Sequence, residues 1–199
     1  MADVHEIPGD RPVRAALDEG GADSGACVVA CPPHPQYGGS RRDSRLRAVS
    51  SALGQRGLDC LRLDYGPWDG GVGEREDVRN ALDWTGERYD TVGLYGYSFG
   101  AGVALHVAAG YEGLCAVSVL SPPSTSVEED DVLAAVDAIE APFQVVAGER
   151  DSTVGWEAVV ERAHARDAAV ETLPGDHFFG GETARVAELA AEFLAARCE

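Results

Sequence analysis

Short apolar segments alternate with helical segments along almost the whole chain, and this alternation limits the fold more than any other feature. Each apolar run has the length of a strand, and the stretch that follows repeats apolar residues every three or four positions, as a helix does. The segments expected to form strands are Ala26–Cys31, Leu58–Leu63, Thr91–Tyr95, Leu114–Leu120, Phe143–Ala147 and Ala169–Leu173. Strands separated by helices form a parallel sheet that is covered on both faces. The sequence therefore predicts an α/β fold with a mostly parallel, doubly wound sheet.

The N-terminal part departs from this alternation. Val4–Ile7 and Pro12–Leu17 have the length of strands, and only a Pro-Gly-Asp-Arg turn separates them. Because no helix lies between them, they predict an antiparallel edge of the sheet. The segments expected to form helices are Arg45–Arg56, Glu74–Glu87, about Ala101–Ala109, Glu128–Ile139, Trp156–Ala165 and Thr183–Arg197. The chain has 199 residues without an internal repeat or a linker, so we expect a single domain over 1–199.

The charge of the chain excludes several classes of function. All 16 basic residues are arginines, against 34 acidic residues, and the formal net charge is −18. Without lysine there can be no Schiff-base or pyridoxal-phosphate enzyme, P-loop NTPase or protein kinase. A pI near 4.5 argues against nucleic acid or an anionic membrane surface as a partner. The composition resembles that of proteins from salt-accumulating halophilic archaea; ordinary surface solubility is the alternative.

The cysteines and the chain ends indicate the cellular setting. The cysteines form no C-x-x-C pair and no metal-ligand cluster, which predicts reduced and mostly buried thiols at Cys27, Cys31, Cys60, Cys115 and Cys198. The N-terminus lacks the basic region and apolar stretch of a signal peptide, and no apolar run is long enough to span a membrane. We therefore expect a soluble, cytoplasmic protein without a metal or cofactor. The sequence does not indicate an oligomeric state.

The segment Gly96-Tyr97-Ser98-Phe99-Gly100 fits the G-x-S-x-G pattern between an apolar strand and an apolar helix. A sharp turn from strand to helix holds the serine in a strained conformation, and side chains at the two glycine positions would clash. The pattern predicts that Ser98 is a nucleophile at the C-terminal edge of the sheet. The alternative is a glycine-rich turn without chemistry. A phosphate-binding turn would need a lysine and G-x-G-x-x-G spacing, which the chain lacks.

A nucleophilic serine needs a histidine base, and His177 is the candidate with the right position. It follows a strand in the loop Pro-Gly-Asp-His-Phe-Phe-Gly-Gly, before the last helix. His5 and His106 do not follow a strand, and His164 lies within a predicted helix, where a partly buried structural histidine is the simpler interpretation. His34 is expected to support its loop by hydrogen bonds, with a catalytic role as the alternative.

The carboxylate that orients the base is expected at Asp151. The strand Phe143–Ala147 ends in the loop Gly-Glu-Arg-Asp, and the order Ser98, Asp151, His177 is the order serine, acid, histidine that one α/β fold with this chemistry uses. Glu149 is the alternative acid. Asp176 adjoins the histidine and is expected to form hydrogen bonds within the loop.

Two backbone N–H groups are expected to bind the oxyanion of the tetrahedral intermediate. One belongs to Phe99, directly after the serine. The other should come from the loop after Cys31, where Gln36 is the first choice and Tyr37 the second, because Pro35 has no N–H. The residues expected to line the substrate pocket are His34, Tyr37, Tyr97 and Phe178.

Four motifs together resemble the small, lidless α/β-hydrolases that are described as dienelactone-hydrolase-like. These motifs are His34-Pro-x-Tyr-Gly-Gly39, Gly73-Glu-x-x-Asp77, Gly-Tyr-Ser-Phe-Gly100 and Asp176-His-Phe-Phe179. The resemblance covers nearly the whole chain and implies an α/β-hydrolase fold without a cap domain, with the triad roles at Ser98, Asp151 and His177. Relatives often carry an Asn-Phe-Arg-Gly-like turn, where this chain has Asp64-Tyr-Gly-Pro-Trp68 without the arginine. Dienelactone hydrolases use a cysteine nucleophile, so their lactone specificity does not carry over.

These features predict a serine hydrolase that acts on carboxylic esters or thioesters through an acyl-enzyme. The segment between Leu120 and Phe143 is too short for a cap domain, so we expect an open site and short acyl chains. An acyltransferase or peptidase with the same triad is one alternative, although acyl transfer needs water to be excluded. A non-catalytic binding protein with this fold is another, although such proteins usually lose a triad member.

Overall fold

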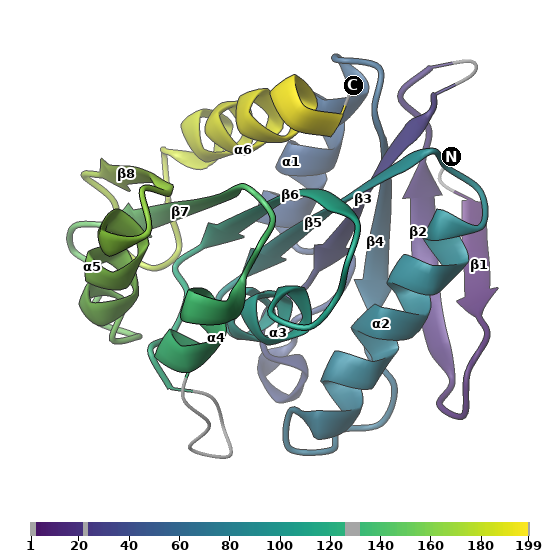
Figure 1. Ribbon diagram of the computed structural model, residues 1–199, viewed down its shortest axis with the longest axis horizontal. Coiled ribbons are helices and arrows are strands. Elements are labelled where there is room, and N and C mark those ends of the chain that lie inside the picture. The colour runs from purple at the N-terminus through teal and green to yellow at the C-terminus, as the bar shows by residue number, and fades with distance from the viewer. Residues whose placement is uncertain (1–2, 22–23, 126–131, 199) are drawn as a thin grey trace.

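The computed structural model describes residues 3–21, 24–125 and 132–198, and an eight-stranded sheet forms its centre (Figure 1). The spatial order of the strands is β1-β2-β4-β3-β5-β6-β7-β8. β1 pairs with β2, and β2 with β4, in antiparallel fashion, whereas all the other pairs are parallel. The predicted antiparallel edge is thus confirmed. The strands are β1 (Asp3–Ile7), β2 (Val13–Asp18), β3 (Ala26–Cys31), β4 (Asp59–Asp64), β5 (Thr91–Tyr97), β6 (Leu114–Leu120), β7 (Phe143–Gly148) and β8 (Ala169–Leu173).

Helices cover both faces of the sheet. Figure 1 shows α1 and α6 together on one face and α2, α3, α4 and α5 on the other. The helices are α1 (Ser44–Gly54), α2 (Val72–Gly86), α3 (Phe99–Ala108), α4 (Val132–Ala138), α5 (Glu157–Ala165) and α6 (Thr183–Cys198), with a short 3-10 helix η1 (Pro35–Tyr37). The helix expected at Glu128–Ile139 falls partly outside the described residues. None of the helices described is long and apolar enough to cross a membrane.

The central strands are buried on both sides, which explains why their sequences are continuously apolar rather than alternating. In β3, Val28 packs in the cluster that contains α1 and α6, whereas its neighbour Val29 packs in the cluster with α2 and α3. Both side chains are fully buried. Each such valine or leucine stabilises the fold by roughly 1.5–3 kcal/mol. Two apolar layers around one sheet therefore hold the strand ends in fixed positions.

The sheet topology indicates that a ligand site would lie at the carboxyl ends of the central parallel strands. From β3 the chain moves outward through α1 to β4, and then returns through α2 to β5 on the other side of β3. The loops that leave β3 and β5 thus diverge at the carboxyl ends of these strands, which is where open α/β sheets bind ligands. In the described part of the segment between β6 and β7, α4 is the only helix or strand. No lid covers this edge among the described residues.

The expectation of five reduced thiols is wrong for two of them. Cys115 and Cys198 form a disulfide, whereas Cys27, Cys31 and Cys60 are free and buried. The two bonded residues are 83 positions apart in the sequence, so no local spacing could indicate the pair. They meet because α6 packs along β5 and β6, which brings the end of the helix beside the start of β6.

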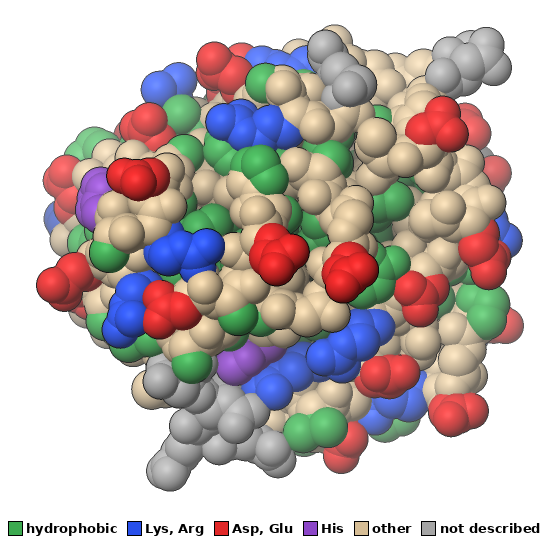
Figure 2. All heavy atoms as spheres, in the orientation of Figure 1, with side chains coloured by type: hydrophobic (Ala, Val, Ile, Leu, Met, Phe, Trp, Pro, Cys, Tyr) green, Lys and Arg blue, Asp and Glu red, His purple; other side chains and the backbone are tan. Residues whose placement is uncertain are grey.

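Charged side chains are spread over the surface. Figure 2 shows the face with α2, α4 and α5, where carboxylates and arginines lie interspersed. Several of the ion pairs are exposed on both sides, such as that between Arg162 and Asp137 at 2.6 Å. Pairs of this kind add little to stability because water and salt screen them.

Candidate active site

The turn from β5 into α3 holds Ser98 in a strained conformation. Its φ is 58° and its ψ is −122°, values that residues with a side chain rarely adopt. The two glycines of the motif make this turn feasible. A Cβ on Gly96 would lie 2.3 Å from the carbonyl oxygen of Gly100, and a Cβ on Gly100 would lie 2.3 Å from that of Pro32. The local sequence therefore forms the sharp turn that the motif predicts.

Ser98, His177 and Asp151 form a continuous hydrogen-bonded chain. Ser98 Oγ lies 2.9 Å from His177 Nε2, and His177 Nδ1 lies 2.8 Å from Asp151 Oδ2. A carboxylate only accepts, so Nδ1 carries the proton and Nε2 is left to accept from the serine hydroxyl. The histidine and the aspartate are both buried. The three residues follow β5, β7 and β8, and the fold brings them to one edge of the sheet.

Further hydrogen bonds fix the acid and the base. The other oxygen of Asp151 accepts the N–H of Thr153 at 2.9 Å. The hydroxyl of Tyr97 donates to the backbone carbonyl of His177 at 2.9 Å. Asp176 accepts the N–H groups of the two residues after the histidine, as expected from the sequence. Both side chains of the pair are therefore held before any substrate binds.

Glu149, the alternative acid, and Ser118, a second buried serine, do not contact the imidazole of His177 in the described hydrogen bonds. Glu149 is exposed at the surface, and Asp151 occupies the position beside the imidazole. Ser118 is a second buried serine, but its hydroxyl donates to Gln144 Oε1 at 2.9 Å. The serine that contacts the imidazole is therefore Ser98.

The two candidates for the second oxyanion donor differ in how free their N–H groups are. Phe99, the candidate for the first donor, is the first residue of α3, so its N–H has no acceptor within the helix. The N–H of Gln36 donates to His34 Nδ1 at a long 3.3 Å, whereas that of Tyr37 donates to the carbonyl of His34 at 3.1 Å. Gln36 would have to give up a weak bond to bind an oxyanion, and Tyr37 a stronger one. This difference favours Gln36 as the second donor.

His34 supports the loop rather than contacting the triad. Its ring lies 4.5 Å from that of Trp68 and 4.9 Å from that of Phe99, measured between ring centroids. Burial lowers the pKa of His34, although the nearby carboxylate of Glu74 raises it. The imidazole is therefore neutral at neutral pH, and its Nδ1 can accept the N–H of Gln36.

A small cavity opens beside the serine. Its volume is about 250 Å³, most of its lining surface is apolar, and the residues that line it include His34, Tyr37, Arg75, Phe99, Val103 and Val154. Of the predicted pocket residues, the structure places His34 and Tyr37 at this cavity. Sequence reasoning missed Gly102, Val103 and His106, although their spacing from Ser98 along α3 indicates one helix face.

Two predicted pocket residues do not line this cavity. Tyr97 is the last residue of β5 and its side chain lies on the sheet face of α1 and α6, where it is buried. Phe178 is 59% exposed and contacts His177 edge-on, at 5.5 Å between centroids. Tyr97 precedes Ser98 at the end of a strand, where successive side chains point to opposite faces, and Phe178 lies exposed against the ring of His177 rather than at the cavity. In the described part of the chain, no group of three His, Cys, Asp or Glu residues is placed to hold a metal ion.

No family model matches the chain. Known structures nevertheless match it over almost its full length. The serine hydrolase XC6422 of Xanthomonas campestris, described as lacking a lid, has a TM-score of 0.82 and 22% identity, over 98% of this chain and 94% of that one. The chain has the lidless α/β-hydrolase fold.

Two further solved structures and one protein found by sequence are also similar to this chain. The dienelactone hydrolase of Anabaena variabilis has a TM-score of 0.80 at 20% identity, over 100% of this chain and 99% of that one. Est1E of Butyrivibrio proteoclasticus, with ferulic acid bound, has a TM-score of 0.83 at 18% identity, over 97% and 98%. By sequence, an uncharacterized protein of Rickettsia prowazekii is 24% identical in an alignment of 180 residues that covers 81% of this chain and 75% of that protein. The predicted fold and the likeness to lidless and dienelactone-type hydrolases are thus confirmed.

Proposed function

We propose that the protein is a serine hydrolase that cleaves carboxylic esters or thioesters of small acids through an acyl-enzyme. The observation that carries the proposal is the hydrogen-bonded chain from Ser98 through His177 to Asp151, which ends at a strained serine beside a cavity. Each member has the partner that its role requires.

The geometry supports the following sequence of steps. His177 Nε2 takes the proton of Ser98 Oγ while the serine attacks the carbonyl carbon of the substrate, and the resulting imidazolium is stabilised by Asp151. The N–H groups of Phe99 and Gln36 bind the oxyanion. His177 then protonates the leaving alcohol or thiol, which departs and leaves an acyl group on Ser98. Water, activated by the same histidine, releases the acid.

The size of the cavity favours a short acyl chain. Its volume of about 250 Å³ lies below the roughly 300–1,000 Å³ that is typical of sites for drug-sized ligands. An apolar acyl chain gains roughly 0.8 kcal/mol for each CH₂ that it buries, but only where a wall exists to bury it. Ferulic acid in Est1E, a small aromatic acid, shows the kind of acid that a protein of this fold accommodates. A small-molecule ester is therefore the substrate class that we propose.

The cellular compartment of the protein is also a proposal. The sequence favours the cytoplasm, but the disulfide between Cys115 and Cys198 is unusual for that compartment. Adaptation to high salt is a further proposal, and it rests on the acidic, lysine-free composition.

A series of p-nitrophenyl esters with increasing acyl length tests the proposed activity. We expect acetate and butyrate to give the highest kcat/KM, and Ser98→Ala to lose at least about 10³-fold in kcat. Ser118→Ala is the matched control, because it also removes a buried serine hydroxyl but lies away from the imidazole. Faster hydrolysis of chains of about twelve carbons would contradict the small cavity. A Ser98→Ala variant within about tenfold of wild type would contradict the mechanism.

A further inference from the structure

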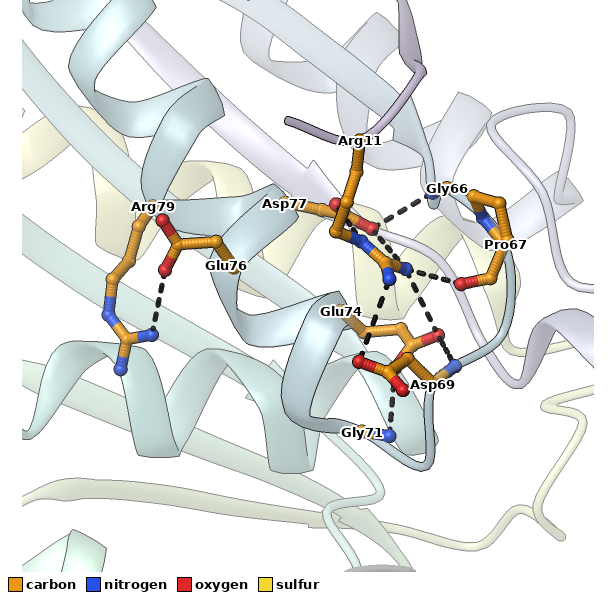
Figure 3. Close-up of polar contacts among 9 residues, drawn as sticks. All are labelled: Arg11, Gly66, Pro67, Asp69, Gly71, Glu74, Glu76, Asp77 and Arg79. Atoms are coloured by element: carbon orange, nitrogen blue, oxygen red, sulfur yellow. Dashed lines mark hydrogen bonds and ion pairs between the residues drawn. The ribbon is translucent and has the colours of Figure 1, made fainter. Parts of the chain in front are cut away.

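Arg11 lies in the turn between β1 and β2 and connects it with two segments that are distant in the sequence (Figure 3). Its Nε donates to Asp77 Oδ1 on α2 at 2.7 Å, and its Nη2 donates to the backbone carbonyl of Pro67 in the loop after β4. It also forms ion pairs with Asp69 at 3.7 Å and with Glu74 at 3.8 Å. One guanidinium therefore holds a hairpin, a loop and the start of a helix together.

The carboxylates that Arg11 neutralises bind the loop directly. Asp77 Oδ2 accepts the N–H of Gly66 at 2.9 Å. The carboxylate of Glu74 accepts the N–H of Asp69 at 2.9 Å and that of Gly71 at 2.8 Å. Both carboxylates are fully buried. Buried charges are costly unless they are paired, so these anchors of the loop depend on the arginine.

The start of α2 is shaped to receive the guanidinium. A Cβ on Gly73 would lie 2.2 Å from Nη1 of Arg11, so a larger residue there would displace the guanidinium. The loop itself, residues 65–71, contains no arginine. The positive charge beside Glu74 and Asp77, the buried carboxylates that bind the loop, comes instead from Arg11 in the β1–β2 hairpin.

The anchored loop forms one side of the candidate active site. Trp68 packs on His34 at 4.5 Å and on Phe99 at 5.5 Å between ring centroids, and Tyr65 meets Phe99 edge-on at 5.7 Å. Gly71 lines the cavity beside Ser98. The loop thus contacts His34, which accepts the N–H of Gln36, and Phe99, whose N–H is the other candidate oxyanion donor.

We propose that Arg11 is a positioning residue: by anchoring residues 65–71 it holds Trp68 against His34 and Phe99, and so sets the shape of the cavity that receives the acyl group. This role rests on the proposed hydrolase function. A purely structural arginine would affect the amount of folded protein, whereas a positioning residue affects which acyl group the folded protein prefers.

Arg11→Lys is the decisive variant. Lysine keeps a positive charge beside Asp77, so the buried carboxylate stays paired, but a single ammonium cannot reproduce the fork that holds Pro67 at the same time. The measurement is kcat/KM for p-nitrophenyl acetate and butyrate, per active site titrated with a fluorophosphonate. We expect about a tenfold loss for butyrate and about threefold or less for acetate, because misplacing a wall affects the longer chain more.

Two further variants separate positioning from stability. Trp68→Ala should shift the ratio of butyrate to acetate rates in the same direction, and Arg11→Lys/Trp68→Ala should shift it no further. Arg14→Gln is the matched control, because this arginine belongs to the same hairpin but is exposed and forms a long ion pair, 3.9 Å, with the exposed Glu6. It should leave the ratio unchanged. An unchanged ratio in Arg11→Lys, with a shifted ratio in Trp68→Ala, would overturn the proposal.

A fluorescence measurement tests the anchoring without any activity. The chain has three tryptophans, so Trp84→Phe/Trp156→Phe leaves Trp68 as the only one. Adding Arg11→Lys should make Trp68 more accessible to quenching by acrylamide, whereas adding Arg14→Gln should not. If wild type hydrolyses neither ester, the proposed function fails, and the quenching still shows whether Arg11 holds Trp68. Equal quenching of Trp68 with and without the Arg11→Lys change would refute the anchoring itself.

Discussion

Ser98 is the residue at which the fold stores strain. A conformation of this kind costs of the order of 1–3 kcal/mol, and it persists only because the strand before it and the helix after it are packed in the core. In the proposed function the strain has a chemical use, since the turn presents Oγ to His177 at 2.9 Å and places the serine at the N-terminus of α3. Backbone N–H groups at that end favour the negative charge that develops in the transition state.

The three residues of the triad should lose activity as a unit. We expect Ser98→Ala, His177→Ala and the double variant to be about equally inactive, because each change breaks the same chain of proton transfer. Asp151→Asn should lower kcat by about 10⁴, since an amide favours the wrong tautomer of the imidazole. Steady-state kinetics on the four folded variants checks this. Additive losses in the double variant would mean that the two residues act separately.

His34 should make stability depend on pH. Burial lowers its pKa in the folded state below the value of about 6.5 that it has when unfolded. The unfolded chain therefore binds the proton more readily, so the stabilisation from neutral His34 is present above about pH 6.5 and is lost as the pH falls through the folded pKa. Denaturant unfolding of wild type and His34→Gln between about pH 7.5 and 5 tests this. The variant should lose less stability on acidification; an equal loss would contradict the assignment.

The residues of the site differ in how far the sequence could predict them. The sequence placed Ser98, Asp151 and His177 at the ends of parallel strands, and the structure brings all three within hydrogen-bond distance. Nearness in sequence to Ser98 and His177 predicts that Tyr97 and Phe178 line the pocket, but it does not determine the direction in which their side chains point. The position of the cavity depends on packing between elements that are distant in the sequence.

At the scale of elements, α6 is tied to the sheet by a covalent bond as well as by packing. Its last residue, Cys198, bonds to Cys115 at the start of β6. Thr91 at the start of β5 also donates from its hydroxyl to the carbonyl of Cys198 at 2.7 Å. The C-terminal helix is therefore anchored at the sheet edge opposite the candidate active site.

Loss of the disulfide should destabilise the fold without changing the active site. Cys198→Ser opens a link between residues 83 positions apart, and a link of this kind typically contributes about 2–4 kcal/mol by restricting the unfolded chain. We expect a lower melting temperature in the variant, a similar decrease when wild type is reduced, and an unchanged kcat/KM at a temperature where both are folded. A melting temperature that does not respond to reductant would show that the bond does not form in solution.

The elements themselves were largely predictable because each has a local pattern. Every predicted strand is present, and the boundaries of the fully described helices differ by at most two residues at either end; for example, α2 begins at Val72 and α3 at Phe99. The contact of Arg11 with Glu74 and Asp77 was not predictable, because it joins segments about sixty residues apart in the sequence. The sequence also does not indicate that both of these carboxylates are buried, as they are in the structure.

At the scale of the whole molecule, the net charge of −18 should make the fold depend on salt. Carboxylates spread over the surface repel one another in dilute buffer (Figure 2). At about 1 M salt the Debye length falls to about 3 Å, and this repulsion is largely screened. We expect the melting temperature and the esterase activity to rise with KCl into the molar range. Equal melting temperatures in about 0.1 M and about 2 M KCl would contradict adaptation to high salt.

Covalent labelling tests the central claim, that Ser98 is an activated nucleophile, most directly. A fluorophosphonate probe is attacked by a serine oxygen and loses fluoride, so it marks the residue that is activated, whatever the natural substrate. Wild type, Ser98→Ala, His177→Ala and Ser118→Ala would be labelled in high salt, each shown to be folded, and the modified peptide would be mapped by mass spectrometry. We predict one label on Ser98 in wild type and in Ser118→Ala, and none in Ser98→Ala or His177→Ala. Labelling of Ser98→Ala, or no labelling of folded wild type, would contradict the claim.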